Sequence, residues 1–143
     1  MRMIVICGSA ALSAALIAAP ASAQSTALVA ANLLGQEVPN GEGDDKASAN
    51  FNGEVNLTRN TICYYLDMDG LGKANAVHIH EKDQAGSDTP TLALQVPGPG
   101  GNEVCVNGDN AVLSAIAKKP DDYYMDIHTP DHADGAVRGK LTD

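Results

Sequence analysis

The stretch ANFNGEVNLTRNTICYYLDMDG, residues 49–70, indicates the fold class of this chain. Its apolar side chains mostly fall on every second position, which is the pattern of a strand with one buried face. Arg59 and Asn60 interrupt the alternation as a tight turn, so we expect 49–58 and 61–70 to form an antiparallel hairpin. The side chains predicted to share the apolar faces are Phe51, Val55, Leu57, Ile62, Tyr64, Leu66 and Met68.

Segments on both sides of this hairpin alternate in the same way and are separated by Gly, Pro, Asn and Asp. We expect further strands at 26–33, 75–81, 91–98, 102–107, 122–129 and 136–142. The segment 109–120 is predicted to be a short helix, capped by Asp109 or Asn110 and ended by Pro120. About eight strands and one helix predict an all-β fold, a Greek-key β-sandwich or barrel.

Residues 1–23 have the features of a signal peptide. Arg2 provides the positive charge, an Ala-rich apolar run follows, and Ala-Ser-Ala at 21–23 is a cleavage signature. We expect cleavage before Gln24 and a single domain over 24–143, in the periplasm or secreted. After Ala23 no apolar run is long enough to cross a bilayer, so no membrane attachment is expected after cleavage.

The chain is acidic, with a formal net charge of -9 that becomes -10 when Arg2 is removed with the signal peptide. An acidic surface argues against nucleic acid and anionic membranes as partners, and it favours cations. The motifs of nucleophilic hydrolases and of phosphate-binding loops are absent from the sequence. Oligomeric state leaves no signal in the sequence.

Two cysteines remain after signal cleavage, Cys63 and Cys105. An even pair in an exported protein favours one disulfide. The alternative is two buried free thiols. A metal site made by the two cysteines is disfavoured, because they lie far apart and neither has a Cys-x-x-Cys partner.

The four histidines form two close pairs in the sequence. In the strand predicted at 75–81, Val77 and Ile79 belong to the core, so His78 and His80 share the opposite face, roughly 7 Å apart. His132 follows in TPDHADG (129–135), which is expected to be a loop.

The last two predicted strands direct further polar side chains away from the core. In the strand at 122–129, Tyr124, Asp126 and His128 alternate with an apolar set and therefore point away from the core. In the strand at 136–142, Val137 faces the core and Arg138 points to the other side. If these strands are neighbours, His78, His80, His128 and Arg138 converge on one outer patch.

Two imidazoles on one strand face can reach one metal ion, and a third from a neighbouring strand completes a set that suits copper or zinc. His132 could curl back as a fourth ligand. The alternative is that these histidines are solvated polar side chains. Asp126 and Asp134 could orient ring nitrogens, although simple solvation is the favoured interpretation for both.

Four ordered motifs resemble the bacterial CHRD domain, a family named after repeats in chordin. Its Gln-Glu-Val-Pro start matches 36–39, and its Ala-His-Ile-His segment matches 76–80 with Val77 inserted. Its His-Thr step matches 128–129, and its Gly-x-Ile-Arg-Gly-x-Leu tail matches 135–141 with Val for Ile. The motifs are LLGQEVPN, GLGKANAVHIHEKDQAG, LQVPGPGG and YYMDIHTPDHADGAVRGKL. The resemblance covers nearly all of 24–143 and implies one CHRD domain.

A Gly-Leu turn, a His-x-His-Glu strand, a later strand ending in His and a Gly-x-x-Arg-Gly tail are together similar to Cu,Zn superoxide dismutase. That family has an eight-stranded Greek-key sandwich, so a superoxide-dismutase-like fold is expected. The resemblance implies that His78, His80 and His128 hold copper and that Arg138 guides superoxide as the catalytic group.

The chain departs from that pattern in three ways. The segment 81–90 contains no histidine, so the family's zinc subsite is absent. His132 is left as a candidate for the bridging ligand, but from a different loop. The cysteine pair does not fall where that family has its disulfide.

We therefore expect an exported CHRD-domain protein that binds one copper ion at a surface site of three histidines, with zinc as the alternative metal and superoxide as a candidate substrate. The rival expectation is a metal-free structural or protein-interaction module. In that module the His-x-His step would support a hydrogen-bond network between strands.

Overall fold

The computed structural model describes residues 25–82 and 89–143, so the expected signal peptide lies outside the described residues. The strands are β1 (Thr26–Leu34), β2 (Ser48–Asn56), β3 (Thr61–Asp69), β4 (Ala76–Glu81), β5 (Leu92–Leu94), β6 (Val104–Asn107), β7 (Tyr123–Thr129) and β8 (His132–Thr142). The helices are α1 (Asn110–Lys118) and the short 3-10 turns η1 (Gly35–Glu37), η2 (Pro39–Gly41) and η4 (Pro120–Asp122).

The predicted hairpin is confirmed. β2 pairs antiparallel with β3 from Ser48↔Asp69 to Asn56↔Thr61, and β1 pairs along the other edge of β2. Burial alternates along β2, because Phe51 and Val55 are buried while Asn50, Asn52 and Glu54 are exposed. The period of two in the sequence therefore matches the two faces of the sheet.

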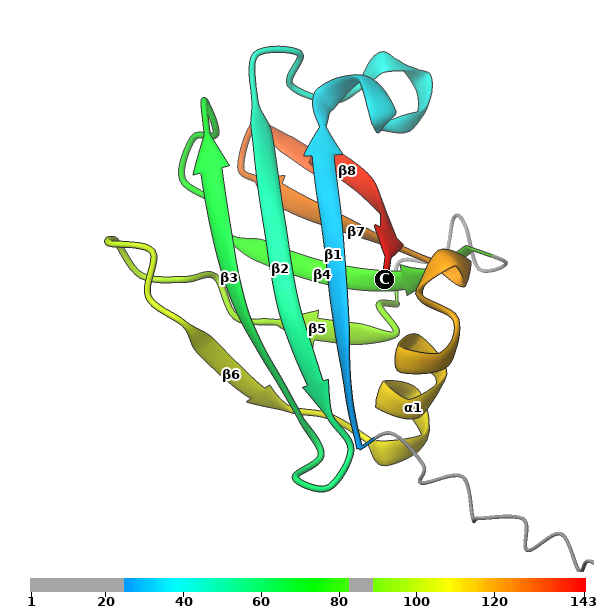
Figure 1. Ribbon diagram of the computed structural model, residues 1–143. Helices are drawn as coiled ribbons and strands as arrows, with labels where there is room; N and C mark the ends of the chain where they lie inside the picture. Colours follow the sequence, from blue (N-terminus) through cyan, green and yellow to red (C-terminus); the bar gives the residue numbers. More distant parts are fainter. Residues whose placement is uncertain (1–24, 83–88) are drawn as a thin grey trace, which may run out of the picture.

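The strands form one antiparallel sheet in the order β5-β4-β7-β8-β1-β2-β3-β6. The sheet curls over on itself, so that β1 and β2 cross in front of β4, β7 and β8 (Figure 1). This nearly closed, barrel-like arrangement confirms the expected all-β fold with one short helix. Among the described residues, no helix is both long enough and apolar enough to cross a bilayer.

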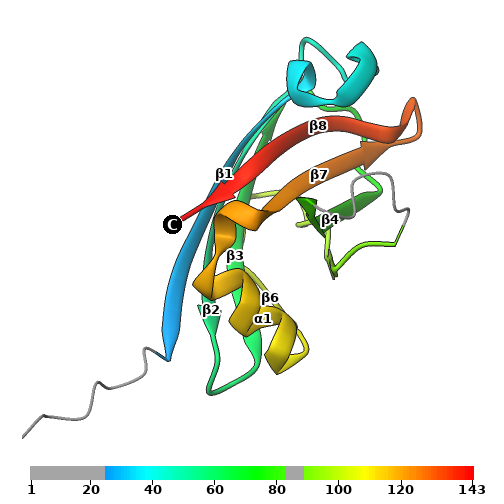
Figure 2. The same cartoon turned by 90° about the vertical axis from the view of Figure 1, so that its right-hand side faces the viewer.

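The core lies between the two halves of the curled sheet. It contains aliphatic side chains from most strands, together with Phe51 and Tyr64, whose ring centroids are 5.4 Å apart. α1 lies at one end of the sheet (Figure 2) and contributes the buried Leu113 and Ile116. Its predicted cap is confirmed, because the Asp109 carboxylate accepts hydrogen bonds from the first turn of the helix.

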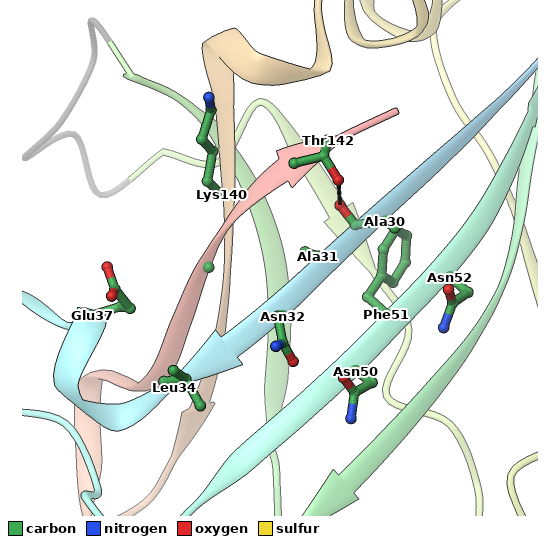
Figure 3. A pocket seen from close by; sticks show the side chains of 11 residues that line it. Ala30, Ala31, Asn32, Leu34, Glu37, Asn50, Phe51, Asn52, Lys140 and Thr142 are labelled. Carbon is green, nitrogen blue, oxygen red and sulfur yellow. Dashed lines mark hydrogen bonds between the residues drawn. The ribbon is translucent and has the colours of Figure 1, made fainter.

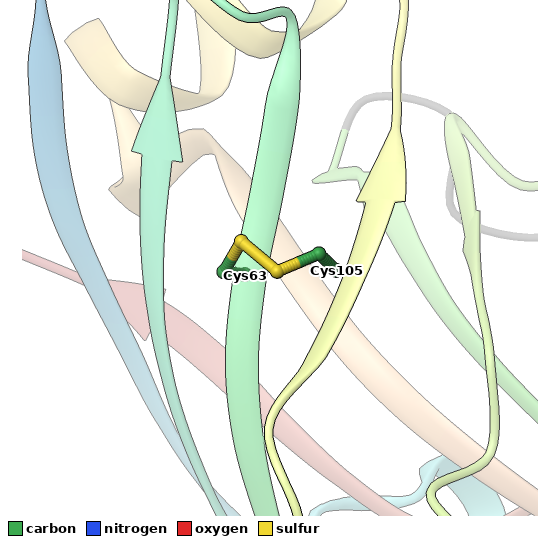
Figure 4. The surroundings of a disulfide bond; sticks show 2 residues. All are labelled: Cys63 and Cys105. Atoms are coloured by element: carbon green, nitrogen blue, oxygen red, sulfur yellow. A yellow bond between two sulfur atoms is a disulfide. The ribbon is translucent and has the colours of Figure 1, made fainter.

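Cys63 and Cys105 form a disulfide, as the sequence predicted (Figure 4). The two residues face each other across the β3–β6 pair, with their Cα atoms 4.0 Å apart. The bond attaches the edge strand β6 to the rest of the sheet.

Two strands differ from the prediction by four residues at one end. TPDHADG was expected to be a loop, but the turn is short and β8 already begins at His132, which pairs with Thr129. β5 is shorter than predicted and ends at Leu94. The carbonyl of the next residue, Gln95, accepts the Tyr64 hydroxyl at 2.6 Å, and Pro97 has no N–H for a ladder.

Candidate metal centre

Three neighbouring strands bring the predicted polar residues together. β4 pairs with β7 so that His78 lies opposite Asp126 and His80 opposite Tyr124. β7 pairs with β8 so that Asp126 lies opposite Arg138. Because side chains on paired positions of adjacent strands share a face, these residues line one side of the sheet, away from the core.

One donor atom from each of His78, His80, Asp126 and His128 lies within 4.8 Å of the others. The His78 Nδ1 atom is 3.2 Å from His128 Nε2, which is 3.0 Å from Asp126 Oδ1. His80 Nε2 is 3.3 Å from the same carboxylate oxygen. Ligands of a tetrahedral ion with bonds of about 2.0–2.1 Å are about 3.4 Å apart, so these spacings fit a first-row metal with small side-chain movements.

The proton of His128 has a defined place. Its Nδ1 atom lies 2.8 Å from the Ala133 carbonyl, which can only accept, so Nδ1 carries a hydrogen and donates it. Nε2 then faces the Asp126 carboxylate, another acceptor. A neutral His128 would direct a lone pair at that carboxylate. A positive charge, supplied by a proton or by a metal ion, therefore belongs between the two groups.

His80 supplies a second indication. Its ring is buried, with 5% exposed, yet Nε2 has no hydrogen-bond partner among the described residues. The 3.3 Å approach to Asp126 has the distance of an ion pair but not the alignment of a hydrogen bond. Buried nitrogens without a partner are rare in folded proteins, and a ligand is one reason for them.

Arg138 pairs with the same carboxylate and packs on Tyr124. Arg138 Nη2 donates to Asp126 Oδ2 at 3.1 Å, and its guanidinium lies 4.4 Å from the centre of the Tyr124 ring. The same ring also stacks on the His80 ring, with the centroids 5.0 Å apart and an angle of 7° between the planes.

The charges of the group depend on one another. Burial raises the pKa of Asp126, but the His128 and His80 rings outweigh this effect and hold that pKa well below its usual range. The hydrogen bond with Asp126 raises the pKa of His128 above 6.5, against the effect of burial. Burial and the nearby His128 lower the pKa of His78. At neutral pH His78 is therefore mainly neutral, as a metal ligand must be.

The cluster lies on the wall of an open pocket of about 900 Å³. The segment containing η1 and η2 forms one side through Val38, Pro39 and Glu42, and the β7–β8 turn forms another through Pro130 and Asp134. These segments explain why Asp126, on the outer face of the sheet, has 1% of its surface exposed. The predicted surface site is therefore a recessed one.

His132, the predicted fourth ligand, lies outside the group of four. Its Nδ1 donates to the Glu42 carbonyl at 2.8 Å, which joins the β7–β8 turn to the segment after η2. Asp134 also lines the pocket. His132 thus does not line the pocket itself, although its bond to Glu42 holds a residue that does, whereas the other three histidines line it.

Asp126 and Tyr124 are the members of the site that sequence reasoning undervalued. Both were placed on the correct face by alternation, but a polar side chain on an outer face is ordinarily solvated. The sequence signal for Asp126 was its place two residues before His128. No local pattern shows that the η1–η2 segment, which precedes Asp126 by 85 to 91 residues, covers it.

Two other features carry less chemistry. Cys63, Glu103 and Cys105 also lie within ligand distance of one another, but both sulfurs are used by the disulfide. A second hollow of about 480 Å³ lies on the outer face of β8, β1 and β2 (Figure 3). Its polar side chains include the amides Asn32, Asn50 and Asn52, and no histidine lines it.

Comparison with known proteins identifies the domain. The family model described as "CHRD domain" matches residues 29–141, which is most of the chain. No curated protein and no solved structure matches the sequence. The resemblance to Cu,Zn superoxide dismutase therefore stays a prediction.

Proposed function

The chain belongs to the CHRD domain family, and from this premise we propose that it is an exported protein that binds one metal ion. The ligands are His78, His80 and His128, with Asp126 beside them. One observation carries the proposal: His128 Nε2 faces a carboxylate and a second imidazole while its Nδ1 is committed to a backbone carbonyl. That arrangement calls for a cation at a defined place.

Copper is the proposed ion. Three imidazoles suit copper and zinc, and copper is the tighter of the two at sites of equal geometry. A bound copper ion would supply one-electron redox chemistry. The chain's own contribution is to hold neutral imidazoles in place, to keep the carboxylate ionised and to give access through the pocket.

Export is supported by two features. Residues 1–23 have the pattern of a cleaved signal peptide, and the disulfide is the kind of bond that persists in oxidising compartments. A periplasmic or extracellular location also gives a copper site access to the metal outside the reducing cytosol.

Superoxide-dismutase-like activity is a second candidate, favoured by one observation. Arg138 is the one arginine or lysine among the residues that line the pocket, and about one fifth of its side chain is exposed. A positive charge beside a redox metal would attract a small anion. This activity requires more than metal binding, so it can be refuted while the proposal of metal binding stands.

The test of metal binding is elemental analysis of the protein purified from its native compartment, followed by copper and zinc titration of the metal-free protein. His78→Ala, His80→Ala and His128→Ala should each weaken copper binding by more than the roughly 10–100-fold that loss of an outer partner costs. His132→Ala is the matched control and should keep copper.

Two results would contradict the proposal. One is wild-type protein that releases all copper to a weak chelator, which would favour a metal-free module with a hydrogen-bonded network between strands. The other is equal copper affinity in His128→Ala and His132→Ala. The test of the activity is separate. Copper-loaded wild type must dismutate superoxide faster than the His78→Ala variant carrying an equal amount of copper.

A further inference from the structure

Arg138 makes two directional contacts in the site. Its Nη2 atom donates to Asp126 Oδ2 at 3.1 Å, and the flat face of its guanidinium covers the Tyr124 ring at 4.4 Å. An arginine placed only to attract a diffusing anion needs neither contact, because attraction depends on charge and distance alone.

Both contacts lead to atoms that face the proposed metal. With Oδ2 held by Arg138, the other carboxylate oxygen, Oδ1, is directed at His128 Nε2 and His80 Nε2. The Tyr124 ring lies between the guanidinium and the His80 ring, with which it is almost parallel. The rotation of His80 is therefore set by a stack whose outer member is Arg138.

We propose that Arg138 and Tyr124 are positioning residues, which fix the Asp126 carboxylate and the His80 ring in the orientation that a metal ion requires. The inference rests on the proposed function for its metal, but not for its geometry. It assigns Arg138 a role in the affinity and geometry of the site that does not depend on any anion.

Burial makes this role effective. Asp126 is almost fully buried and His80 nearly so, whereas the Arg138 side chain is one-fifth exposed. A carboxylate in such surroundings keeps its charge only while it has partners, and a buried ring turns only if its neighbours move. Loss of the guanidinium leaves Oδ2 without this donor and removes one side of the stack.

Arg138→Lys separates the two roles. Lysine keeps the positive charge that attraction of an anion needs, but it has neither the planar fork nor the flat face. Tyr124→Leu removes the stacking surface, and Tyr124→Phe keeps it. Lys140→Met is the matched control, because Lys140 lies two residues further along β8 on the same face and its Nζ pairs with Asp121 at 3.0 Å, outside the pocket.

Two measurements are made on each variant. The first is the nuclear magnetic resonance spectrum of the histidine rings in metal-free protein, which records the ring nitrogens and the protons bound to ring carbons. His132 is the internal reference. The second is copper affinity by chelator competition, together with the electron paramagnetic resonance spectrum of the copper form. We expect Arg138→Lys and Tyr124→Leu to shift the His80 resonances and to weaken copper binding about 10–100-fold. Tyr124→Phe and Lys140→Met should match wild type.

The outcomes are distinct. If Arg138→Lys leaves the ring spectra, the copper affinity and the paramagnetic spectrum unchanged, the positioning role is refuted. If wild type binds no copper, the proposed function fails, while the ring spectra of the metal-free variants still decide whether Arg138 and Tyr124 position His80. Altered His132 resonances in Arg138→Lys would indicate general misfolding and would also refute a local role.

Discussion

Asp126 is the residue on which the site depends. One oxygen accepts from Arg138, and the other faces His128 and His80. Such a buried carboxylate would normally be neutral, because desolvation disfavours its charge. Here the His128 and His80 rings outweigh burial and keep the pKa of Asp126 low. The site thus carries a fixed negative charge that can balance part of a metal's charge.

Asp126→Asn tests this charge while keeping the shape of the side chain. We expect metal-free protein to lose about 1–3 kcal/mol of unfolding free energy, because Arg138 and His128 lose a charged partner. Copper affinity should fall as well. Urea unfolding from pH 4 to pH 9, with chelator present, measures the stability.

The pH dependence of that loss has a definite sign. The raised pKa of His128 stabilises the fold fully below 6.5, and this contribution disappears as pH rises through the folded value. The lowered pKa of Asp126 stabilises the fold above 3.8, and this contribution disappears as pH falls. The difference in unfolding free energy between wild type and Asp126→Asn should be largest between pH 3.8 and pH 6.5 and should become smaller toward pH 9. A difference that grows toward pH 9 would contradict the His128–Asp126 coupling.

For individual residues, the sequence predicted the sheet face on which each side chain lies better than it predicted whether that side chain is buried. Strand alternation put His78, His80, Asp126 and His128 on one face, and the structure brings them together. It did not predict that His80 and Asp126 are buried, because the covering segments are remote in sequence. His132 shows the same limit. Its backbone begins a strand, and its ring bonds to a carbonyl ninety residues away.

Individual elements follow local sequence closely where a hairpin or a cap defines them. β2, β3 and α1 begin and end within about two residues of their predicted bounds, because the turn at 57–60 and the Asp109 cap are local signals. β5 and β8 differ because tertiary contacts decide their ends. The irregular pairing between Ile127 and Thr129 is part of this, since it places His128 opposite the Ala133 carbonyl.

The disulfide gives a prediction at the level of strands. Within the described part of the chain, β6 is an edge strand of four residues that pairs only with β3, so its attachment depends strongly on the Cys63–Cys105 bond. Cys63→Ser with Cys105→Ser should cost about 2–5 kcal/mol for a bond that spans 42 residues. Copper affinity should stay within twofold of wild type, because neither cysteine lines the metal pocket.

Thiol titration provides the check on the bond itself. Processed wild type, unfolded without reductant, should show no reactive thiol, since the proposed signal-peptide cleavage would remove Cys7. Two reactive thiols in that experiment would show that the bond does not form in the native protein. Unchanged stability in the double variant would show that β6 is held by its ladder alone.

The whole molecule carries 18 acidic against 9 basic residues, with a sequence pI near 4.6. Its long-range field therefore attracts cations and repels anions, whatever the pocket contains. The residues that line the pocket repeat this balance, since Glu42, Asp126 and Asp134 face a single guanidinium. This field would favour entry of the proposed metal, whereas a superoxide anion would have to overcome it with help from the local charge of Arg138.

Ionic strength therefore separates the two steps. The rate at which metal-free protein takes up copper can be monitored by stopped flow in sodium nitrate. This rate should fall as the salt concentration rises, by on the order of tenfold where steering contributes strongly. The physical reason is screening, because added salt shortens the range of the attraction to about 10 Å at 0.1 M. Dismutation by loaded protein, if present, should instead be constant or faster in salt. Sucrose at equal osmolality is the control. It is uncharged and does not screen charges, so it should not reproduce the effect of salt on either rate. Copper loading that accelerates with salt would mean that the acidic field does not guide the metal to this site.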